Sequence, residues 1–345
     1  MGTRIYLATS KGVATIQEDS GNWAVTSQAL SQWDVTEIAV DPNNANRVYA
    51  GTRGDGVLLS EDGGQHWSKP NRGKTGPGKV RCVTIDPHDA DMLWVGTEPI
   101  GMWISTDRGA NWQELQSVRD LPGADSIDYP VPAVEPHVRD IVIDHTNPDN
   151  IFASLQVGYM IKSQDRGETW TLLNEGIDPD VHTIALSPTD PNKIYVTTGG
   201  EGYREGIAPG RSLYRTADGG SSWVPLAMDF EQEYSVPLAV NPVNPDIIYA
   251  SLAIGNPGEW LKHPDGAQSS IVRSNDGGES WHALDAGSVV SKQFAVAIAV
   301  DQEHPDNVFA ATRGGDLVAS SDGGDSWYEL GVQVPQAADI KIVSI

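Results

Sequence analysis

The sequence predicts an all-β fold built from repeated four-stranded antiparallel sheets. Three observations support this prediction: a short turn phrase recurs down the chain, pairs of β-rich runs recur between its copies, and no long stretch has helical periodicity. The 36 glycines and 22 prolines among the 345 residues suit a protein with many turns.

The turn phrase reads Ser/Thr-x-Asp-x-Gly-x-x-Trp. Six copies match it without a gap, at residues 60–67, 105–112, 163–170, 216–223, 274–281 and 320–327, and a degenerate seventh lies at 16–23. In a tight turn, aspartate accepts backbone hydrogen bonds and glycine supplies a positive φ, while the tryptophan returns to the core as a large apolar side chain. The repetition predicts hairpin turns in which the aspartates are structural and not catalytic.

Pairs of β-rich runs lie between these turns, each pair joined by a turn rich in Pro, Asn and Asp. They occupy residues 38–52, 83–97, 141–155, 184–198, 238–252 and 298–312. With a third strand, the hairpin turn and a fourth strand, each unit contains four antiparallel strands. Successive tryptophans of the turn phrase are 44, 45, 58, 53, 58 and 46 residues apart, which is the period of a propeller blade.

The ends of the chain predict how the ring closes. Residues 4–23 align with 47–67, so the chain begins at the second strand of a blade, and the final run 340–345 supplies the missing first strand. The prediction is a seven-bladed β-propeller that forms one domain over 1–345. The expected blades are 339–345 with 3–28, then 35–72, 79–118, 138–176, 181–229, 235–286 and 294–332.

Charge and cysteine content narrow the class of protein. A formal net charge of −24 argues against binding nucleic acid or anionic membranes. The single cysteine, Cys82, lies in an apolar run and is expected to be a buried, inert thiol. The N-terminus is too weakly apolar for a signal peptide, and no run approaches the ~20 apolar residues of a membrane span. A cytoplasmic protein is therefore expected.

The predicted topology assigns the loops to two faces of the ring. The hairpin turns and the Pro/Asn/Asp turns fall on one face. The opposite face carries the connections from second to third strands and from blade to blade, of which 113–138, 198–213 and 253–271 are long. Long loops on a rigid scaffold commonly carry function, so a ligand site is expected at the channel mouth on this second face.

Histidines, arginines and a carboxylate from neighbouring blades are expected to crowd this mouth. Four candidate catalytic residues and four candidate ligand-binding residues lie there: His137, His182, Glu98 and Tyr234, and Arg81, Arg139, Arg53 and Arg204. The set suits acid/base chemistry on an anionic substrate held by the arginines, or a divalent metal bound by the two histidines and Glu98. The structural alternative is a hydrogen-bonded polar plug in the channel.

Aromatic and acidic residues near the same face indicate that the ligand could be a carbohydrate. Trp103 and Trp260 are candidates to stack on a sugar ring, and the alternative is that they are buried loop anchors. The acidic residues there could include a glycosidase-type pair: Asp34, Glu98, Glu135, Glu201, Glu205 and Glu259.

The turn phrase resembles the Asp-box, or BNR repeat, over nearly the whole chain. The chain is similar to the small soluble single-propeller BNR proteins described as glycosyl-hydrolase-like or sialidase-like, which the runs 97–99, 136–139 and 182–183 also resemble. More distantly it resembles photosystem II assembly-factor propellers. Typical sialidases carry an Arg-Ile-Pro motif that is absent here, and the xyloglucanases with this repeat hold their glycan between two propellers.

The resemblance implies a soluble hydrolase or lyase that processes a small or carbohydrate-like, anionic ligand. The alternative is a non-catalytic scaffold or assembly factor that binds a protein partner through its long loops.

Overall fold

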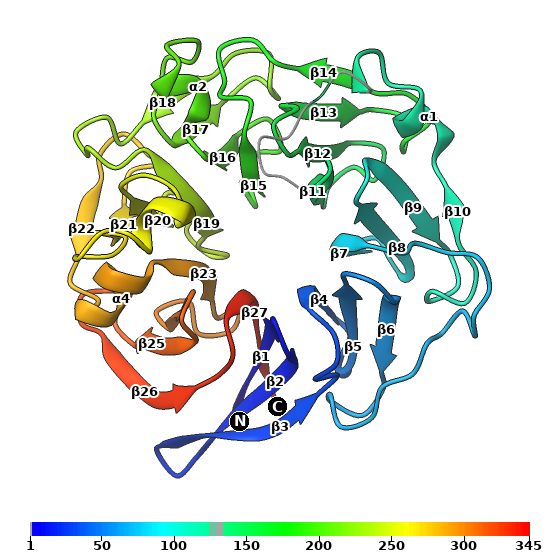
Figure 1. Ribbon diagram of the computed structural model, residues 1–345, viewed down its shortest axis with the longest axis horizontal. Helices are drawn as coiled ribbons and strands as arrows, with labels where there is room; N and C mark the ends of the chain where they lie inside the picture. The colour runs from blue at the N-terminus through cyan, green and yellow to red at the C-terminus, as the bar shows by residue number, and fades with distance from the viewer. Residues whose placement is uncertain (1, 125–126, 128–133) are drawn as a thin grey trace.

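The computed structural model describes residues 2–124, 127 and 134–345, which form seven antiparallel sheets around a central channel (Figure 1). Six of the sheets have four strands and the sheet of blade 2 has three. The predicted all-β, seven-bladed propeller is confirmed.

Blade 1 combines the last strand of the chain with the first three, and each later blade uses consecutive strands. Blade 1 contains β27 (Ala337–Ser344), β1 (Thr3–Thr9), β2 (Gly12–Asp19) and β3 (Asn22–Ala29). Blade 2 contains β4 (Val35–Asp41), β5 (Asn44–Thr52) and β6 (Gly56–Ser60). Blade 3 contains β7 (Val80–Asp86), β8 (Asp89–Thr97), β9 (Gly101–Ser105) and β10 (Gln113–Glu114). Blade 4 contains β11 (Val138–Ile143), β12 (Ile151–Leu155), β13 (Met160–Ser163) and β14 (Thr171–Leu173).

The last three blades repeat the same order. Blade 5 contains β15 (Val181–Leu186), β16 (Ile194–Thr198), β17 (Leu213–Thr216) and β18 (Val224–Leu226). Blade 6 contains β19 (Tyr234–Val240), β20 (Ile248–Ala253), β21 (Ser270–Ser274) and β22 (His282–Leu284). Blade 7 contains β23 (Ala295–Val300), β24 (Val308–Thr312), β25 (Asp316–Ser320) and β26 (Tyr328–Gln333). Within the described residues, four short helices lie in connections: α1 (Gln116–Arg119), α2 (Glu201–Arg204), α3 (Pro257–Trp260) and α4 (Ser288–Gln293).

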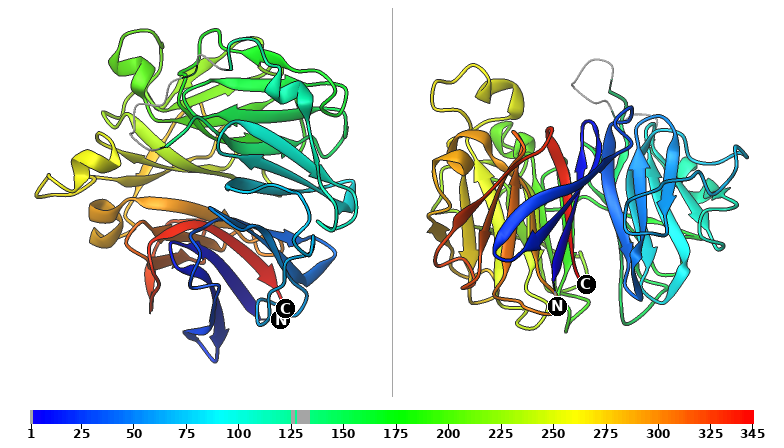
Figure 2. Two further views of the ribbon diagram at one scale, coloured as in Figure 1. Left: turned by 45° about the vertical axis from the view of Figure 1, so that its right-hand side comes forward. Right: turned by 90° about the horizontal axis from the view of Figure 1, so that it is seen from below.

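The ring closes by pairing its last strand with its first. β27 runs antiparallel to β1, from Thr3 opposite Ser344 to Thr9 opposite Ala337. Beyond the strands, Gly2 and Ile345 exchange two backbone hydrogen bonds of 2.8 Å. The termini consequently lie side by side, on the face opposite the loop that carries α3 (Figure 2). The predicted closure is confirmed.

The repeated turn folds as its residue types require. In blade 6, Ser274 Oγ donates to Asp276 Oδ1 at 2.8 Å and accepts the backbone N–H of Gly278 at 2.8 Å. Asp276 also accepts the N–H of Ser280 at 2.9 Å, while Trp281 Nε1 donates to the Gly278 carbonyl at 3.1 Å. The aspartate is thus fully used in holding the turn, as the repetition predicts.

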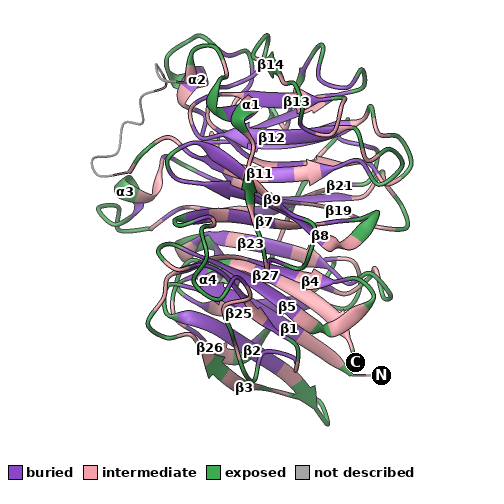
Figure 3. Ribbon diagram, turned by 90° about the vertical axis from the view of Figure 1, so that its right-hand side faces the viewer, coloured by how far each residue is buried: buried purple, intermediate pink, exposed green. Residues whose placement is uncertain are grey.

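The core lies between adjacent blades, where the inner strands are largely buried (Figure 3). Tyrosines in the second strands connect one blade to the next. The hydroxyl of Tyr195 in β16 donates to the Gly277 carbonyl at 3.0 Å, and that of Tyr249 in β20 donates to the Gly323 carbonyl at 2.8 Å. Each tyrosine therefore fixes the repeated turn of the following blade, which makes the scaffold around the channel rigid.

No helix in the described part of the chain is long and apolar enough to cross a membrane. The helices α2 and α3 instead extend the loops between second and third strands. Figure 2 shows the α3 loop projecting from the face opposite the termini. Both helices contribute residues to the wall of the central cavity.

Candidate functional site

A cavity of about 1070 Å³ occupies the channel mouth on the face of α2 and α3. Its wall includes Glu201 and Arg204 from α2, and Pro257 and Trp260 from α3. The long loops 198–213 and 253–271 therefore contribute to the cavity. The cavity lies on the face where a ligand site is predicted, and its use as a site stays a prediction.

Three positions recur in blades 2 to 7 around the mouth, although not all of them reach the cavity: the residue at or before the start of the first strand, the residue two further on, and the residue that follows the second strand. In blades 2 to 5 these positions are almost all polar: Asp34, Thr36 and Arg53; Lys79, Arg81 and Glu98; His137, Arg139 and Gln156; Asp180, His182 and Gly199. In blades 6 and 7 aromatic and aliphatic residues dominate: Tyr234, Val236, Ile254, Phe294 and Val296, with Arg313 as the exception. The mouth therefore has a hydrogen-bonding side and an apolar side.

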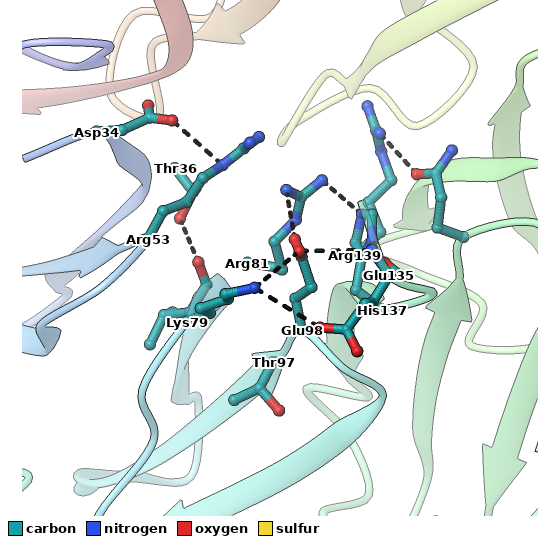
Figure 4. A network of polar contacts seen from close by, with 12 residues as sticks. Asp34, Thr36, Arg53, Lys79, Arg81, Thr97, Glu98, Glu135, His137 and Arg139 are labelled. Atoms are coloured by element: carbon teal, nitrogen blue, oxygen red, sulfur yellow. Dashed lines mark hydrogen bonds and ion pairs between the residues drawn. The ribbon is translucent and has the colours of Figure 1, made fainter. Parts of the chain in front are cut away.

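Glu98 anchors the polar side in blade 3. Its carboxylate is buried, Lys79 Nζ lies 3.4 Å from Oε1, and Arg81 donates to Oε2 at 3.2 Å (Figure 4). Glu98 is not among the residues that line the cavity. Held by two cations and screened from the ligand space, this carboxylate orients Arg81 and is poorly placed for catalysis.

His137 lies behind the same arginine and is held as a neutral ring. Arg81 lies 2.5 Å from Nε2, and the carbonyl oxygen of Glu135 lies 2.9 Å from Nδ1. Because guanidinium is only a donor and a carbonyl is only an acceptor, Nδ1 carries the single proton. Burial, together with the positive charges of Arg81, Arg139 and Arg53, lowers the pKa of His137 to about 2.

His182 is also satisfied by protein groups at both ring nitrogens. Nδ1 lies 2.6 Å from the Ser235 carbonyl, and Nε2 lies 3.3 Å from Oδ2 of Asp180. The side chain is only 2 % exposed. This arrangement argues against the predicted acid/base role of both histidines, since no ring nitrogen is left to face a substrate.

Asp180 is the centre of a hydrogen-bonded chain that crosses two blades. Arg139 donates to Oε1 of Gln156 at 2.7 Å, and Nε2 of Gln156 donates to Oδ1 of Asp180. The other carboxylate oxygen faces His182. Burial alone would raise the pKa of Asp180, but the attraction and hydrogen bond of His182, with the charges of Arg139 and Arg204, outweigh it and lower the pKa.

Glu201 provides a second carboxyl group with the opposite perturbation. It lines the same cavity from the first turn of α2. Burial raises its pKa, and the negative charges of Asp180 and Glu205 add to the effect. Two carboxyl groups whose pKa values are displaced in opposite directions, beside one cavity, are the arrangement expected of an acid and a base.

Three aromatic rings support the apolar side. Tyr234 packs edge-on against Trp260, with ring centroids 5.3 Å apart, and against Phe294 at 5.7 Å. Trp260 Nε1 donates to the Ile254 carbonyl at 2.7 Å, which fixes the ring. Tyr234 and Trp260 both border the cavity, and their roles toward a ligand stay predictions.

The structure departs from two other expectations. Trp103, a predicted ligand-binding residue, packs against a core cluster that includes Tyr49 and Leu93, and it does not line the cavity. Trp103 lies in β9, and its side chain packs between blades. The sequence pattern alone did not show whether Trp103 belongs to a strand or to a loop of the ligand-binding face. In the described residues, no three His, Cys, Asp or Glu side chains gather where they could hold a metal ion. The metal set of His137, His182 and Glu98 is not assembled.

Asp180, Gln156 and Arg313 line the cavity and were not singled out from the sequence. A signal for all three was available, since Asp180 occupies the same repeat position as His137, immediately before a first strand. Gln156 and Arg313 occupy the same repeat position as Glu98, immediately after or at the end of a second strand.

Comparison with known proteins supports the fold over most of the chain. No family model matches the sequence. The xyloglucanase Xgh74A of Acetivibrio thermocellus is 28% identical over 160 residues, which make up 42% of this chain and 17% of that protein. A xyloglucanase of Hypocrea jecorina is 28% identical over 140 residues, 36% of this chain and 16% of that protein. The chain therefore spans less than a fifth of the length of these curated relatives.

Two solved structures illustrate the structural likeness. The GH74 xyloglucanase of Xanthomonas campestris superposes with a TM-score of 0.70 and 19% identity, covering 94% of this chain and 52% of that one. A structure of YCF48 bound to a D1 peptide has a TM-score of 0.58 and 17% identity, covering 86% of this chain and 81% of that one. At such identities the likeness shows the propeller fold alone.

Proposed function

We propose that the protein binds a carbohydrate-like ligand in the cavity at the channel mouth and hydrolyses a glycosidic bond there. The observation that supports this most directly is the pair Asp180 and Glu201, which border one cavity with pKa values shifted in opposite directions. The partial sequence similarity to xyloglucanases is consistent with a glycan ligand.

In this proposal Glu201 acts as the general acid and Asp180 as its counterpart. Protonated Glu201 donates its proton to the glycosidic oxygen as the bond to the anomeric carbon breaks. Asp180 is ionised, and either accepts a proton from the attacking water or attacks the anomeric carbon itself. His182 and Gln156 each contact one oxygen of Asp180, so they are positioning residues for this carboxylate.

The apolar side gives the sugar a surface on which to stack. Tyr234 and Trp260 border the cavity in blade 6, next to blade 5, which carries Asp180, and the ring centroid of Tyr234 lies 5.2 Å from that of His182. Aromatic rings on one side and hydrogen-bonding groups on the other are the common composition of sites for small polar ligands.

The test is hydrolysis of a panel that includes xyloglucan oligosaccharides, cello-oligosaccharides and oligogalacturonides by the wild type, Asp180→Asn and Glu201→Gln. We expect each variant to lose activity by at least about a hundredfold. Glu175→Gln, at an exposed position outside the cavity, is the control and should retain it. Binding of a panel member without hydrolysis by the wild type would refute the catalytic step and leave a sugar-binding protein.

The second candidate is a non-catalytic protein that binds a protein segment. Exposed apolar residues on the loops of α2 and α3 favour it: Ile207 is 64% exposed, Ile254 38% and Leu261 91%. Part of the other loop expected to bind a partner, 113–134, lies outside the described residues. An Ile207→Ser, Leu261→Ser variant that still hydrolyses the glycan would separate the two functions.

A further inference from the structure

Three arginines of the central cavity have no carboxylate partner among the residues that the structure describes. Arg139 donates to Gln156 Oε1 at 2.7 Å, Arg204 donates to the Gly199 carbonyl at 3.0 Å, and Arg313 lies beside the amide of Gln336. In contrast, most arginines elsewhere in the protein contact an Asp or Glu, as Arg47 contacts Asp41 at 2.7 Å. In a chain of net charge −24, these guanidinium groups line a cavity and are hydrogen-bonded directly to neutral groups, so no carboxylate at ion-pair distance among the described residues balances their charge.

Arg139 and Arg204 converge on one region of the wall. They come from adjacent blades, and both guanidinium charges act on the carboxyl group of Asp180. Each arginine uses one N–H group in its recorded hydrogen bond, whereas a guanidinium has five. Several donors are therefore available on each side chain.

The neighbouring carboxyl groups leave this positive charge incompletely balanced. Both oxygens of Asp180 already face donors, namely Gln156 and His182. Glu201 makes no ion pair with Arg204 among the described residues, and burial raises the pKa of Glu201 even though the charge of Arg204 acts to lower it. An anion from outside the protein would complete the arrangement.

We infer that Arg139 and Arg204 form a subsite for an oxyanion carried by the ligand: a carboxylate, sulfate or phosphate group. Guanidinium binds such groups with paired, charge-assisted hydrogen bonds, and Arg is preferred to Lys where this geometry matters. The anionic group would lie against blades 4 and 5, and the body of the ligand against Tyr234. The substrate class of the proposed hydrolase then becomes an acidic glycan. The identification of the substrate as an acidic glycan rests on the proposed hydrolase function. The binding of an oxyanion by Arg139 and Arg204 does not depend on it.

The test is isothermal titration calorimetry at low ionic strength with four probes: inorganic phosphate, sulfate, glucuronate and glucose. We expect the wild type to bind at least one of the three anions more tightly than glucose. The anion that binds with the highest affinity indicates which oxyanion group the ligand carries. Arg139→Gln and Arg204→Gln should each lower the affinity of the protein for that anion by about tenfold or more, since a charge-assisted hydrogen bond is worth ~1.5–3 kcal/mol. Arg72→Gln removes the same charge from an exposed position outside the cavity and should change nothing.

Anion binding that is equal in the wild type and both variants, or absent from the wild type, would overturn the subsite. Its failure is distinguishable from that of the proposed hydrolysis. If the Arg variants and the wild type cleave neutral and acidic oligosaccharides alike while Glu201→Gln is inactive, the subsite is wrong and the hydrolase stands. If the anions bind through Arg139 and Arg204 but no glycan is cleaved, the subsite stands and the hydrolase is wrong.

Discussion

The guanidinium group of Arg81 donates a hydrogen bond of 2.5 Å to Nε2 of the buried His137. Because Nδ1 donates to the Glu135 carbonyl, the ring has no room for a second proton in the folded protein. The arrangement makes His137 a neutral acceptor that aims Arg81 at the channel, in place of the catalytic group expected from its residue type.

This relationship predicts a specific pH dependence of stability. The pKa of His137 falls from 6.5 to about 2 on folding, so below the unfolded value the unfolded chain binds a proton that the native protein does not. The contribution of the neutral His137 ring to the free energy of unfolding is fully present above pH 6.5. It declines by about 1.4 kcal/mol per pH unit as the pH falls below that value. In His137→Gln this decline should vanish. The stability difference between wild type and variant should therefore shrink by about 2 kcal/mol between pH ~6.5 and ~4.5.

Urea unfolding of both proteins at several pH values measures the difference. His282→Gln, at an exposed position, is the control and should run parallel to the wild type. A stability difference between His137→Gln and wild type that is constant with pH would show that the ring can be protonated in the native state.

The close approach of Gly199 to Asp180 predicts a sensitive position in the site. A Cβ atom at residue 199 would overlap Oδ2 of Asp180 and lie 3.3 Å from Cε1 of His182. Gly199→Ala should displace the carboxylate and lower kcat/KM, or ligand affinity if only binding is observed, by about tenfold or more. Gly78→Ala, where the added atom meets nothing within 4 Å, should have no effect. Full activity in Gly199→Ala would contradict the role given to Asp180.

The repeated turn predicts unequal contributions from two serines of one copy. Ser274 Oγ is buried and accepts the Gly278 N–H, so Ser274→Ala leaves a buried donor unsatisfied. The free energy of unfolding should fall by about 1–3 kcal/mol. Ser280 is exposed and only donates to Asp276 Oδ2, so Ser280→Ala should cost less. Chemical denaturation of the two variants gives the comparison, and an equal loss would count against the explanation.

The fold was predictable because its determinants are local and repeated. The turn phrase fixes a blade by chemistry within eight residues, as the contacts of Ser274 and Asp276 show. Blade 2 was expected to have four strands and to extend to residue 72, and its sheet has three strands. There only the bridge between Leu59 and Ser68 stands in place of the fourth strand. Pro70, which has no N–H, and the glycines that follow interrupt further pairing.

The site was predictable only in part because its contacts join different blades. The sequence places Arg139 and His182 at equivalent entries, but it does not show that Gln156 and Asp180 connect them. Nor does residue type reveal whether a histidine has a nitrogen left for a substrate, since that depends on which donor or acceptor a neighbouring blade supplies.

The closing strand predicts one more pH effect, centred on Lys341. Its ammonium group lies 3.0 Å from Asp339 Oδ1 and 3.9 Å from Glu37 Oε1, and burial raises the pKa values of Glu37 and Asp140 nearby. Lys341→Met would remove the attraction that offsets burial and raise those pKa values further. Folded carboxyl groups with raised pKa values stabilise the protein at low pH, and this stability is lost as the pH rises through the carboxyl range.

The stability deficit of Lys341→Met relative to wild type should therefore be small near pH ~4 and grow to about 1 kcal/mol above pH ~7. The effect is modest because the Lys341 side chain is 37% exposed to the channel, where solvent screens the ion pairs. Thermal unfolding of the variant and of Lys11→Met, an exposed control, measures the deficit across this range. A deficit that is larger at low pH would contradict the expected sign, and a deficit that is constant with pH would show that Lys341 stabilises the ring through packing and not through charge.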